Sequence, residues 1–186
     1  MNDVLEVIKR RRSIRGFQEK QISKQDLDLL VEAGLSAPTA VNSQARHLTV
    51  VQDRSLIEKL NCWVAEVVDK SEDPHMADVK KWSGGRYFSN APTLIVVSAP
   101  KDDRWGHVNA AIAAQNIVLA AESLGIGSCW NGMILALLMS PKLQECVGTL
   151  ALPEGYVPAN AVTLGYRASA VPPAPERKPN LVNYIS

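Results

Sequence analysis

The sequence lacks the features that identify several large classes of protein. Its three cysteines, Cys62, Cys129 and Cys146, lie far apart with no paired spacing, which argues against a disulfide framework or a zinc cluster. Its three histidines show no metal-ligand spacing, and neither H-E-x-x-H nor G-x-S-x-G occurs. We therefore expect no resident metal and no serine-nucleophile chemistry.

Net charge and long apolar runs are also scarce. Lysine and arginine number 20 against 19 acidic residues, so the net charge of +1 gives no field that would attract nucleic acid or membranes. The apolar run at 133–139 is far too short to span a bilayer. The N-terminus shows no basic segment followed by an apolar one, as a signal peptide would. We expect a cytoplasmic protein with no nucleic-acid or membrane partner.

What the chain does contain is a mixture of helical and strand patterns over 186 residues, 46% of them apolar. We interpret residues 1–186 as a single domain. Helices are predicted over residues 4–8 with Asn2 or Asp3 as cap, over 27–34 after a cap at Ser23, over 56–68 after a cap at Asp53, and over 108–124. Another helix opens at Ser140-Pro141. Strands are predicted over residues 47–52, 93–99, 126–130 and 159–165. Because the two patterns do not alternate strictly, an α+β fold is favoured over a doubly wound sheet.

Two segments fit neither pattern. Residues 70–90 are charged and contain Gly84-Gly85, so we interpret them as a surface excursion with one short helix and as a candidate lid. Residues 171–186 form a C-terminal arm that begins with a proline-rich stretch. Such a stretch has no core of its own and is either disordered or lies on another surface. The helix over 108–124 is apolar on nearly every side, which indicates burial at the centre of the fold or at a subunit interface.

The most distinctive motif is the arginine cluster Arg10-Arg11-Arg12-Ser13-Ile14-Arg15. Guanidinium groups match the oxygens of a phosphate with paired donors. Such a cluster in a nearly neutral chain points to a small phosphorylated ligand. A solvated charged face is the plainer alternative, and a nucleic-acid surface is a third, less favoured because no basic patch extends it.

Two loops add weaker signals. Residues 36–44 (SAPTAVNSQ) carry small hydroxyl and amide groups that suit a planar heterocycle, although a simple polar turn remains an alternative. Residues 124–132 (LGIGSCWNG) follow a predicted helix rather than a strand and have Trp130 at the third glycine position, so they are not a dinucleotide fingerprint. Backbone N–H groups at Asn131-Gly132 could instead face a ligand closely.

Taken in order, these segments resemble the FMN-dependent nitroreductase superfamily. The resemblance rests on RRRSIRGF, LSAPTAVNSQARHLTVV, NAPTLIVVSA, AAIAAQNIVLAAESLGIGSCWNG, LPEGYVPANAVTLGY and APERKPNLVNYI, which span almost the whole chain. It implies an α/β sandwich with a central, mainly antiparallel sheet flanked by helices. It also implies an intertwined homodimer, with FMN at the subunit interface.

The resemblance also assigns roles to residues. Arg11, Ser13 and Arg177 would bind the FMN phosphate, with Arg12 and Lys178 beside it, and Arg15 would reach the pyrimidine edge of the flavin. The partner subunit would contact the ring and ribityl chain through four loop residues: Pro38, Thr39, Ala40 and Asn42. The backbone of Asn131 and Gly132 would face flavin N5, and no catalytic side chain is expected because the flavin carries the redox chemistry.

The implied activity is an NAD(P)H oxidoreductase, using NADH or NADPH, that passes hydride through flavin N5 to a nitroaromatic, quinone or similar small electron-poor acceptor. Departures from the family pattern are Gln44-Ala45-Arg46, where Gln-Pro-Trp is usual, together with Asn109 and Asn131. The altered corner motivates an alternative, a flavin carrier or sensor without NAD(P)H turnover.

Overall fold

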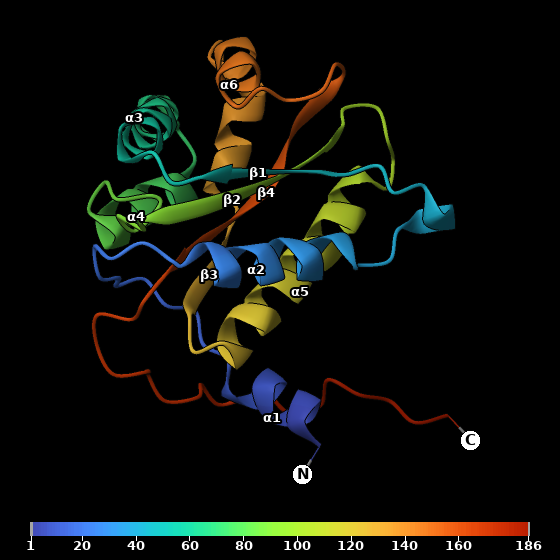
Figure 1. Cartoon of the computed structure of the whole chain (residues 1–186). Coiled ribbons are helices and arrows are strands. Elements are labelled where there is room, and N and C mark those ends of the chain that lie inside the picture. Colours follow the sequence, from blue (N-terminus) through green and yellow to red (C-terminus); the bar gives the residue numbers. More distant parts are fainter. Residues whose placement is uncertain (1, 186) are drawn as a thin grey trace.

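The protein, described here from a computed structural model covering residues 2–185, is built on one four-stranded sheet (Figure 1). The strands are β1 (His47–Val51), β2 (Thr93–Pro100), β3 (Gly127–Asn131) and β4 (Tyr156–Gly165). Their order across the sheet is β1-β2-β4-β3, and each neighbouring pair is antiparallel. The α+β class and the antiparallel sheet predicted from the sequence are confirmed.

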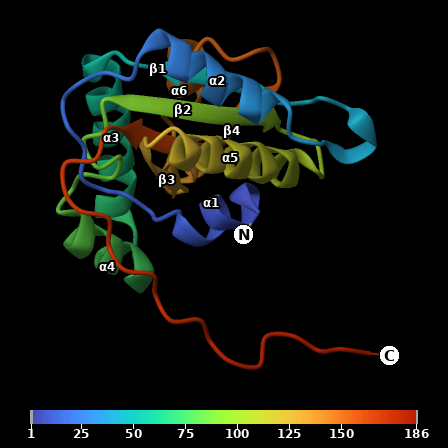
Figure 2. The same ribbon diagram turned by 60° about the horizontal axis from the view of Figure 1, so that its bottom comes forward.

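Helices cover both faces of the sheet. Helices α2 (Lys24–Leu35) and α5 (Gly106–Ser123) lie on one face, and α3 (Arg54–Lys70), η2 (Met133–Met139) and α6 (Leu143–Thr149) lie on the other (Figure 1). Helix α1 (Asp3–Arg10) lies outside α5, as Figure 2 shows. Two further short elements, α4 (Pro74–Ser83) and η1 (Ala40–Asn42), complete the chain.

The sequence of β2 explains its central position. Its side chains alternate between two cores: Ile95 and Val97 pack with α2 and α5, whereas Leu94 and Val96 pack with α3 and η2. A strand buried on both faces reads as a continuous apolar run rather than as an alternation. The run TLIVVSA at 93–99 is therefore what this position in the sheet requires.

The predicted helix starts are set by their capping residues. Asn2 accepts a hydrogen bond from the N–H of Val4, and Ser23 accepts one from the N–H of Asp26. Asp53 accepts from the first turn of α3 and so caps that helix. Each side chain satisfies a backbone donor that has no partner inside its own helix.

Most of residues 70–90 is exposed and includes one short helix, as predicted, but the interpretation missed the side chains that anchor the segment to the core. The segment contains the ten-residue helix α4, capped by Asp73, and the side chains of Val79, Tyr87 and Phe88 are buried in the core shared with α3. Asn61 of α3 holds the turn that follows α4, because its side chain bonds the Gly85 carbonyl and the Tyr87 N–H, both at 2.8 Å. The role of this segment as a lid stays a prediction.

Element boundaries differ from prediction in two other places. The helix expected to open at Ser140-Pro141 begins at Leu143, because the carbonyl and hydroxyl of Ser140 accept bonds from Leu143 N and Lys142 N and form a turn first. The apolar run at 133–139 forms the 3₁₀ helix η2, which no periodicity had indicated. Among residues 2–185, none of the helices combines the length and apolar character needed to cross a bilayer.

Candidate functional site

Residues 11–15 form an extended segment attached to the edge strand β3. Ser13 pairs with Ser128 in a parallel β-bridge, and the N–H of Ile14 donates to the Ser128 carbonyl at 2.9 Å. Ile14 is only 7% exposed, whereas Ser13 and Arg15 are exposed. Because side chains alternate along an extended backbone, Arg11, Ser13 and Arg15 lie on the side opposite Ile14. Two guanidinium groups and a hydroxyl thus share one face.

Arg12 has a different role from its neighbours. Its Nη1 donates to the carbonyls of Lys9, Arg10 and Arg11 at 2.7, 3.0 and 2.7 Å. These are carbonyls at the end of α1, which have no partners within the helix. The Arg12 side chain closes the helix here through Nη1, whereas its buried Nε has no hydrogen-bond partner among the described residues.

Arg15 contacts the segment that follows α3. Its guanidinium carbon lies 5.4 Å from the centroid of the Trp82 ring, a cation–π contact. Trp82 is on α4 and is more than half exposed. The contact brings α4, predicted as part of an excursion, to the edge of the arginine segment.

The far end of β3 carries Asn131 and Gly132. The side chain of Asn131 is used internally: Nδ2 donates to the Tyr87 carbonyl at 2.8 Å, and Oδ1 accepts from the N–H of Met133 at 2.9 Å. A Cβ placed on Gly132 would lie 3.1 Å from the indole of Trp130. The Asn131 side chain therefore fixes this turn, and the lack of a side chain at Gly132 leaves room for the indole.

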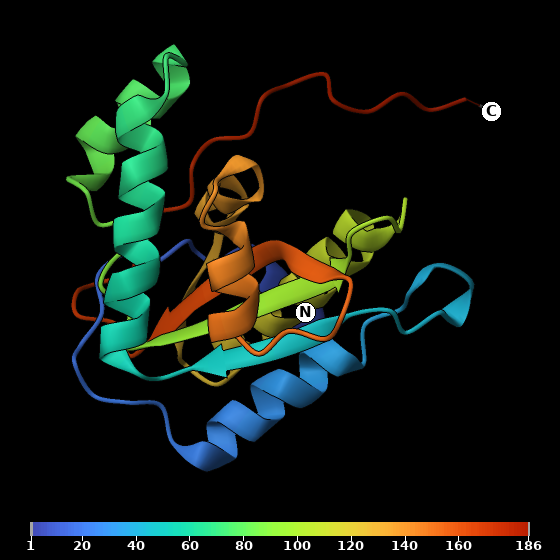
Figure 3. The same cartoon turned by 90° about the horizontal axis from the view of Figure 1, so that it is seen from above.

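The loop at 38–42 is not brought to the same place. Figures 1 and 3 show η1 projecting from the end of the molecule away from α1 and β3. Thr39 Oγ1 accepts from Gln44 N at 2.9 Å, and Asn109 of α5 accepts from Ala40 N at 3.0 Å. These bonds support a turn in which Asn42 has a positive φ of 52°. The loop at 38–42 is therefore separated from the segment at 11–15 within one chain.

Two of the departures noted in the sequence serve this loop. Asn109 is nearly fully buried, and its side-chain oxygen holds the backbone of η1. Arg46 donates from Nη2 to the carbonyl of Leu35, the last residue of α2. A cation at a helix C-terminus is electrostatically favourable, so Arg46 stabilises the end of α2.

The C-terminal tail carries the other two predicted phosphate ligands. Arg177 and Lys178 are exposed on an extended segment that runs away from the body of the protein (Figure 2). Beyond them the tail exposes large apolar side chains at Leu181, Val182 and Tyr184. The structure does not bring Arg177 or Lys178 against Arg11 through any interaction between described residues.

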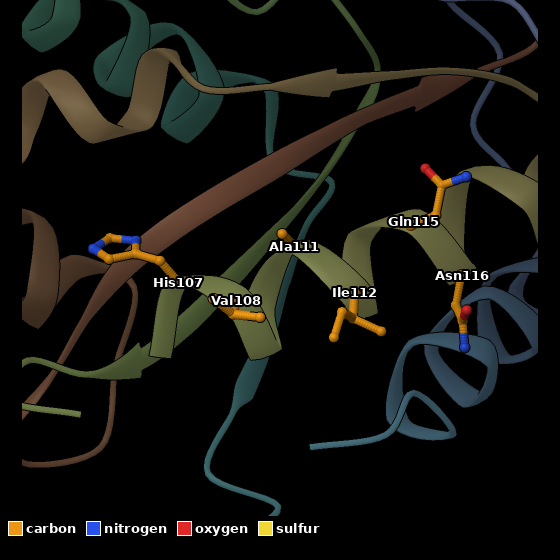
Figure 4. A pocket seen from close by; sticks show the side chains of 6 residues that line it. All are labelled: His107, Val108, Ala111, Ile112, Gln115 and Asn116. Carbon is orange, nitrogen blue, oxygen red and sulfur yellow. The ribbon is translucent and has the colours of Figure 1, made fainter. Parts of the chain in front are cut away.

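A shallow apolar groove runs along the outer face of α5 (Figure 4). It is lined by His107, Val108, Ala111, Ile112, Gln115 and Asn116. Val108 is 48% exposed, and three residues on the neighbouring helix α1 are similarly exposed, namely Val4, Leu5 and Ile8. The prediction that α5 would be apolar on nearly all sides is confirmed, and its outer side faces away from the core.

One charged cluster was missed by the sequence analysis. Glu122, in the last turn of α5, is 4% exposed and bonds both Arg10 and Arg167. A single acidic residue near the end of an otherwise apolar helix was the available signal. Its two partners lie 112 and 45 positions away, which no local pattern reveals.

Comparison with known proteins identifies the family. The model of the nitroreductase family matches residues 8–166. The chain belongs to the nitroreductase family. A nitroreductase from Bacteroides fragilis solved with bound FMN is 32% identical over the full length of both chains, with a TM-score of 0.89. One from Desulfitobacterium hafniense, also with bound FMN, is 31% identical over both full chains, with a TM-score of 0.91.

Curated relatives agree with this assignment. A protein of Methanothermobacter thermautotrophicus, provisionally named NADH dehydrogenase/NAD(P)H nitroreductase, is 33% identical over 170 residues, which cover 89% of this chain and 78% of that protein. An FMN reductase [NAD(P)H] of Bacillus subtilis is 26% identical and covers 99% of this chain and 74% of its own length. The resemblance stated from the sequence motifs, and the fold that it implied, are confirmed.

Proposed function

We propose that this nitroreductase-family protein binds FMN and, as a homodimer, passes hydride from NADH or NADPH to a small electron-poor acceptor such as a nitroaromatic or a quinone. The observation that carries the proposal is the extended segment at 11–15, which the Ser13–Ser128 bridge and the Ile14–Ser128 hydrogen bond fix along β3. Alternation along this segment places Arg11, Ser13 and Arg15 on one face. When bound, FMN accepts and releases the hydride at N5. The family match and the FMN-bound structures of its relatives support the assignment.

The donor set of the segment suits a phosphate monoester. Such a group carries nearly two negative charges and several acceptor oxygens. Arg11 offers paired donors, Ser13 offers a hydroxyl, and each can reach a different oxygen. Arg15, two residues further on, would turn from the Trp82 ring toward the pyrimidine edge of the flavin, where a cation favours hydride uptake. The internal bonds of the Asn131 side chain leave the backbone of the turn at 131–132 to face N5.

The second half of the site would come from the partner subunit. Within one chain the loop at 38–42 is separated from the arginine segment, although both carry ligand-type groups. The apolar outer face of α5 and the exposed apolar residues of α1 form a surface that association would bury. A two-fold dimer would bring Asn42 of one chain toward Arg11 of the other. The tail, with Arg177 and Lys178, would be ordered by the same association.

A complementation experiment tests the shared site directly. Arg11→Ala and Asn42→Ala are purified separately, and each is expected to bind FMN weakly and to oxidise NAD(P)H slowly. The two are then unfolded together and refolded as a mixture. In a mixed dimer, one site combines the intact Arg11 of one chain with the intact Asn42 of the other. Random mixing of a two-fold dimer restores about a quarter of the sites.

The outcomes separate the possibilities. Recovery of FMN binding and turnover in the mixture, and in neither parent, supports a site built from two chains. No recovery contradicts it, because each chain would then carry its own complete and damaged site. Recovered FMN binding without NAD(P)H oxidation, in the mixture and in the wild type alike, would favour the carrier or sensor over the oxidoreductase. Refolded wild type at the same protomer concentration is the control.

A further inference from the structure

Glu122 is a buried carboxylate whose two oxygens are held by different arginines. Its Oε1 accepts from Arg10 Nε at 2.8 Å, and its Oε2 accepts from Arg167 Nη2 at 2.6 Å. Arg10 belongs to the end of α1, and Arg167 follows the end of β4. One side chain of α5 therefore connects two segments that lie on either side of it in the sequence.

The location of Glu122 makes both partners necessary. A carboxylate in the last turn of a helix lies beside the negative end of the helix dipole. Helix α5 has no basic residue of its own in that turn. A buried carboxylate that lost its cationic partners would be strongly unfavourable. The two arginines therefore come to Glu122 from elsewhere, and their positions become fixed by it.

The bond to Arg10 matters because α1 contributes no buried side chain to the core of its own chain. None of the residues of α1 is buried, and Val4, Leu5 and Ile8 are about half exposed or more. The Arg10–Glu122 bond is thus a principal attachment of the last turn of α1. Arg11, a predicted phosphate ligand, follows that turn immediately, so its starting position depends on the bond.

Arg167 holds the other end of the same segment. Phe17 forms an antiparallel bridge with Arg167, and Gln18 Nε2 donates to the Arg167 carbonyl at 2.9 Å. A Cβ on Gly127 would lie 3.0 Å from both Arg167 Cγ and Ile14 Cγ2, so glycine there lets the two side chains pass. The chain is therefore tied to the Glu122 cluster both before Arg11 and after Arg15.

We infer that Glu122 is a positioning residue for the FMN phosphate. Through Arg10 and Arg167 it fixes the two ends of the segment at 11–15, so that Arg11 and Ser13 face the phosphate together. The inference rests on the proposed function, since it concerns the same cofactor. It adds a residue that contacts no ligand and is itself an anion, the opposite charge to what a phosphate would attract.

The sign of one mutational effect separates positioning from simple electrostatics. Glu122→Gln removes a negative charge near the predicted phosphate site. If the charge of Glu122 acted only by repelling the phosphate through space, its removal would strengthen FMN binding. A positioning role predicts weaker FMN binding, because the side-chain amide of glutamine has one acceptor oxygen and can no longer accept hydrogen bonds from both arginines. We expect the Kd for FMN to rise at least about fivefold, equivalent to about 1 kcal/mol.

The measurement compares FMN with riboflavin, which has the same ring and ribityl chain but no phosphate. Quenching of flavin fluorescence gives both dissociation constants for the apoprotein. If Glu122→Gln disturbs only the phosphate site, the Kd for FMN rises and the Kd for riboflavin stays within about twofold of the wild-type value. Glu145→Gln is the matched control, because Glu145 also bonds two cations, Lys59 and Lys142, but lies on α6.

Several results would overturn the inference. Equal weakening of FMN and riboflavin binding in Glu122→Gln would show a general structural role. Unchanged or tighter FMN binding would show that Glu122 does not position the phosphate site. If wild-type protein bound neither flavin, the proposed function itself would fail and this inference with it. If the wild type binds FMN and Glu122→Gln binds it equally well, the inference fails and the proposed function stands.

A second variant covers the case in which Glu122→Gln does not fold. The side chain of Arg10 is 60% exposed, so its replacement leaves the core intact. Arg10→Lys keeps the positive charge but loses the Nε donor that holds Glu122 Oε1. Weaker FMN binding with riboflavin binding unchanged supports positioning by geometry. FMN binding equal to wild type contradicts it, since charge alone would then suffice.

Discussion

Asn131→Ala is expected to destabilise the protein substantially, because the side chain of Asn131 joins three parts of the structure. It is 9% exposed, donates to the carbonyl of Tyr87 at 2.8 Å and accepts from the N–H of Met133 at 2.9 Å. Alanine would leave a carbonyl and an N–H unpaired at a mostly buried site. Each unsatisfied group costs about 1–3 kcal/mol, so we expect a loss of about 3 kcal/mol in the free energy of unfolding.

For a protein of this size, that loss corresponds to a fall in Tm of roughly 6–12 °C. Urea unfolding followed by circular dichroism, at one fixed protomer concentration, measures the free energy and its slope together. Asn61→Ala is the matched comparison. Asn61 also makes two bonds to the turn at 85–87, at 2.8 Å each, but lies on α3 away from the turn at 131–132.

The two variants should therefore lose similar stability and differ in cofactor binding. Asn131→Ala should also weaken FMN binding, since the turn that would face the flavin loses its internal support. Asn61→Ala should bind FMN nearly as wild type does. A midpoint for Asn131→Ala within error of wild type would refute the reasoning, because it would show that neither bond contributes to stability.

Three further predictions concern other parts of the fold. A Cβ on Gly165 would lie 2.8 Å from the ring of the proline that precedes β2, so Gly165→Ala should lower the free energy of unfolding by about 1–3 kcal/mol in a urea titration. Hydrogen bonds from Ser55 lower the pKa of Asp53 below its ordinary value of 3.8. The charged form of Asp53 thus stabilises the fold above that value, and the contribution is lost as the pH falls through the lowered pKa. The Tm of Asp53→Asn should therefore lie below wild type near pH 7, and the two values should converge in acid; a constant gap would contradict this. Burial raises the pKa of the Cys146 thiol to about 11, whereas Cys62 is exposed. A thiol reagent at pH 8 should modify Cys62 first, and Cys62→Ser should remove that fast phase.

Local patterns in the sequence were sufficient to predict most helices and strands. The caps Asn2, Ser23 and Asp53 act within a few positions of themselves, so the sequence shows them directly. The buried run of β2 was equally clear, because a strand between two helical layers must be apolar on both sides. Because the motifs occur along the chain in the order typical of the family, the resemblance could be stated from the sequence.

What the sequence could not show depends on contacts between distant residues. The burial of Tyr87 and Phe88 follows from packing against α3. The charged residues at 70–81 had indicated that the whole segment was exposed. Arg12 looked like its neighbours, yet the end of α1 takes up its side chain. The partners of Glu122 lie too far along the chain for any periodicity to reveal them.

The separation of the candidate site into two halves was implied by the family resemblance alone. Nothing in the spacing of Asn42 and Arg11 indicates that they lie apart within one chain, and only the three-dimensional arrangement shows it. The roles of Asn109 and Arg46 became clear in the same way. Asn109 supports η1 and Arg46 supports the end of α2, which gives each of these two departures a structural role.

The central claim is that the protein is an FMN-dependent NAD(P)H oxidoreductase. Its most direct test is the visible spectrum of the FMN-reconstituted protein during anaerobic titration, first with NADH and then with NADPH. The account predicts that the oxidised flavin bands bleach with about one equivalent of at least one nicotinamide, as a two-electron hydride transfer requires, and return when a quinone is added. A bound flavin that neither nicotinamide bleaches would contradict the account, and a protein that cannot be reconstituted with FMN would contradict the cofactor assignment as well.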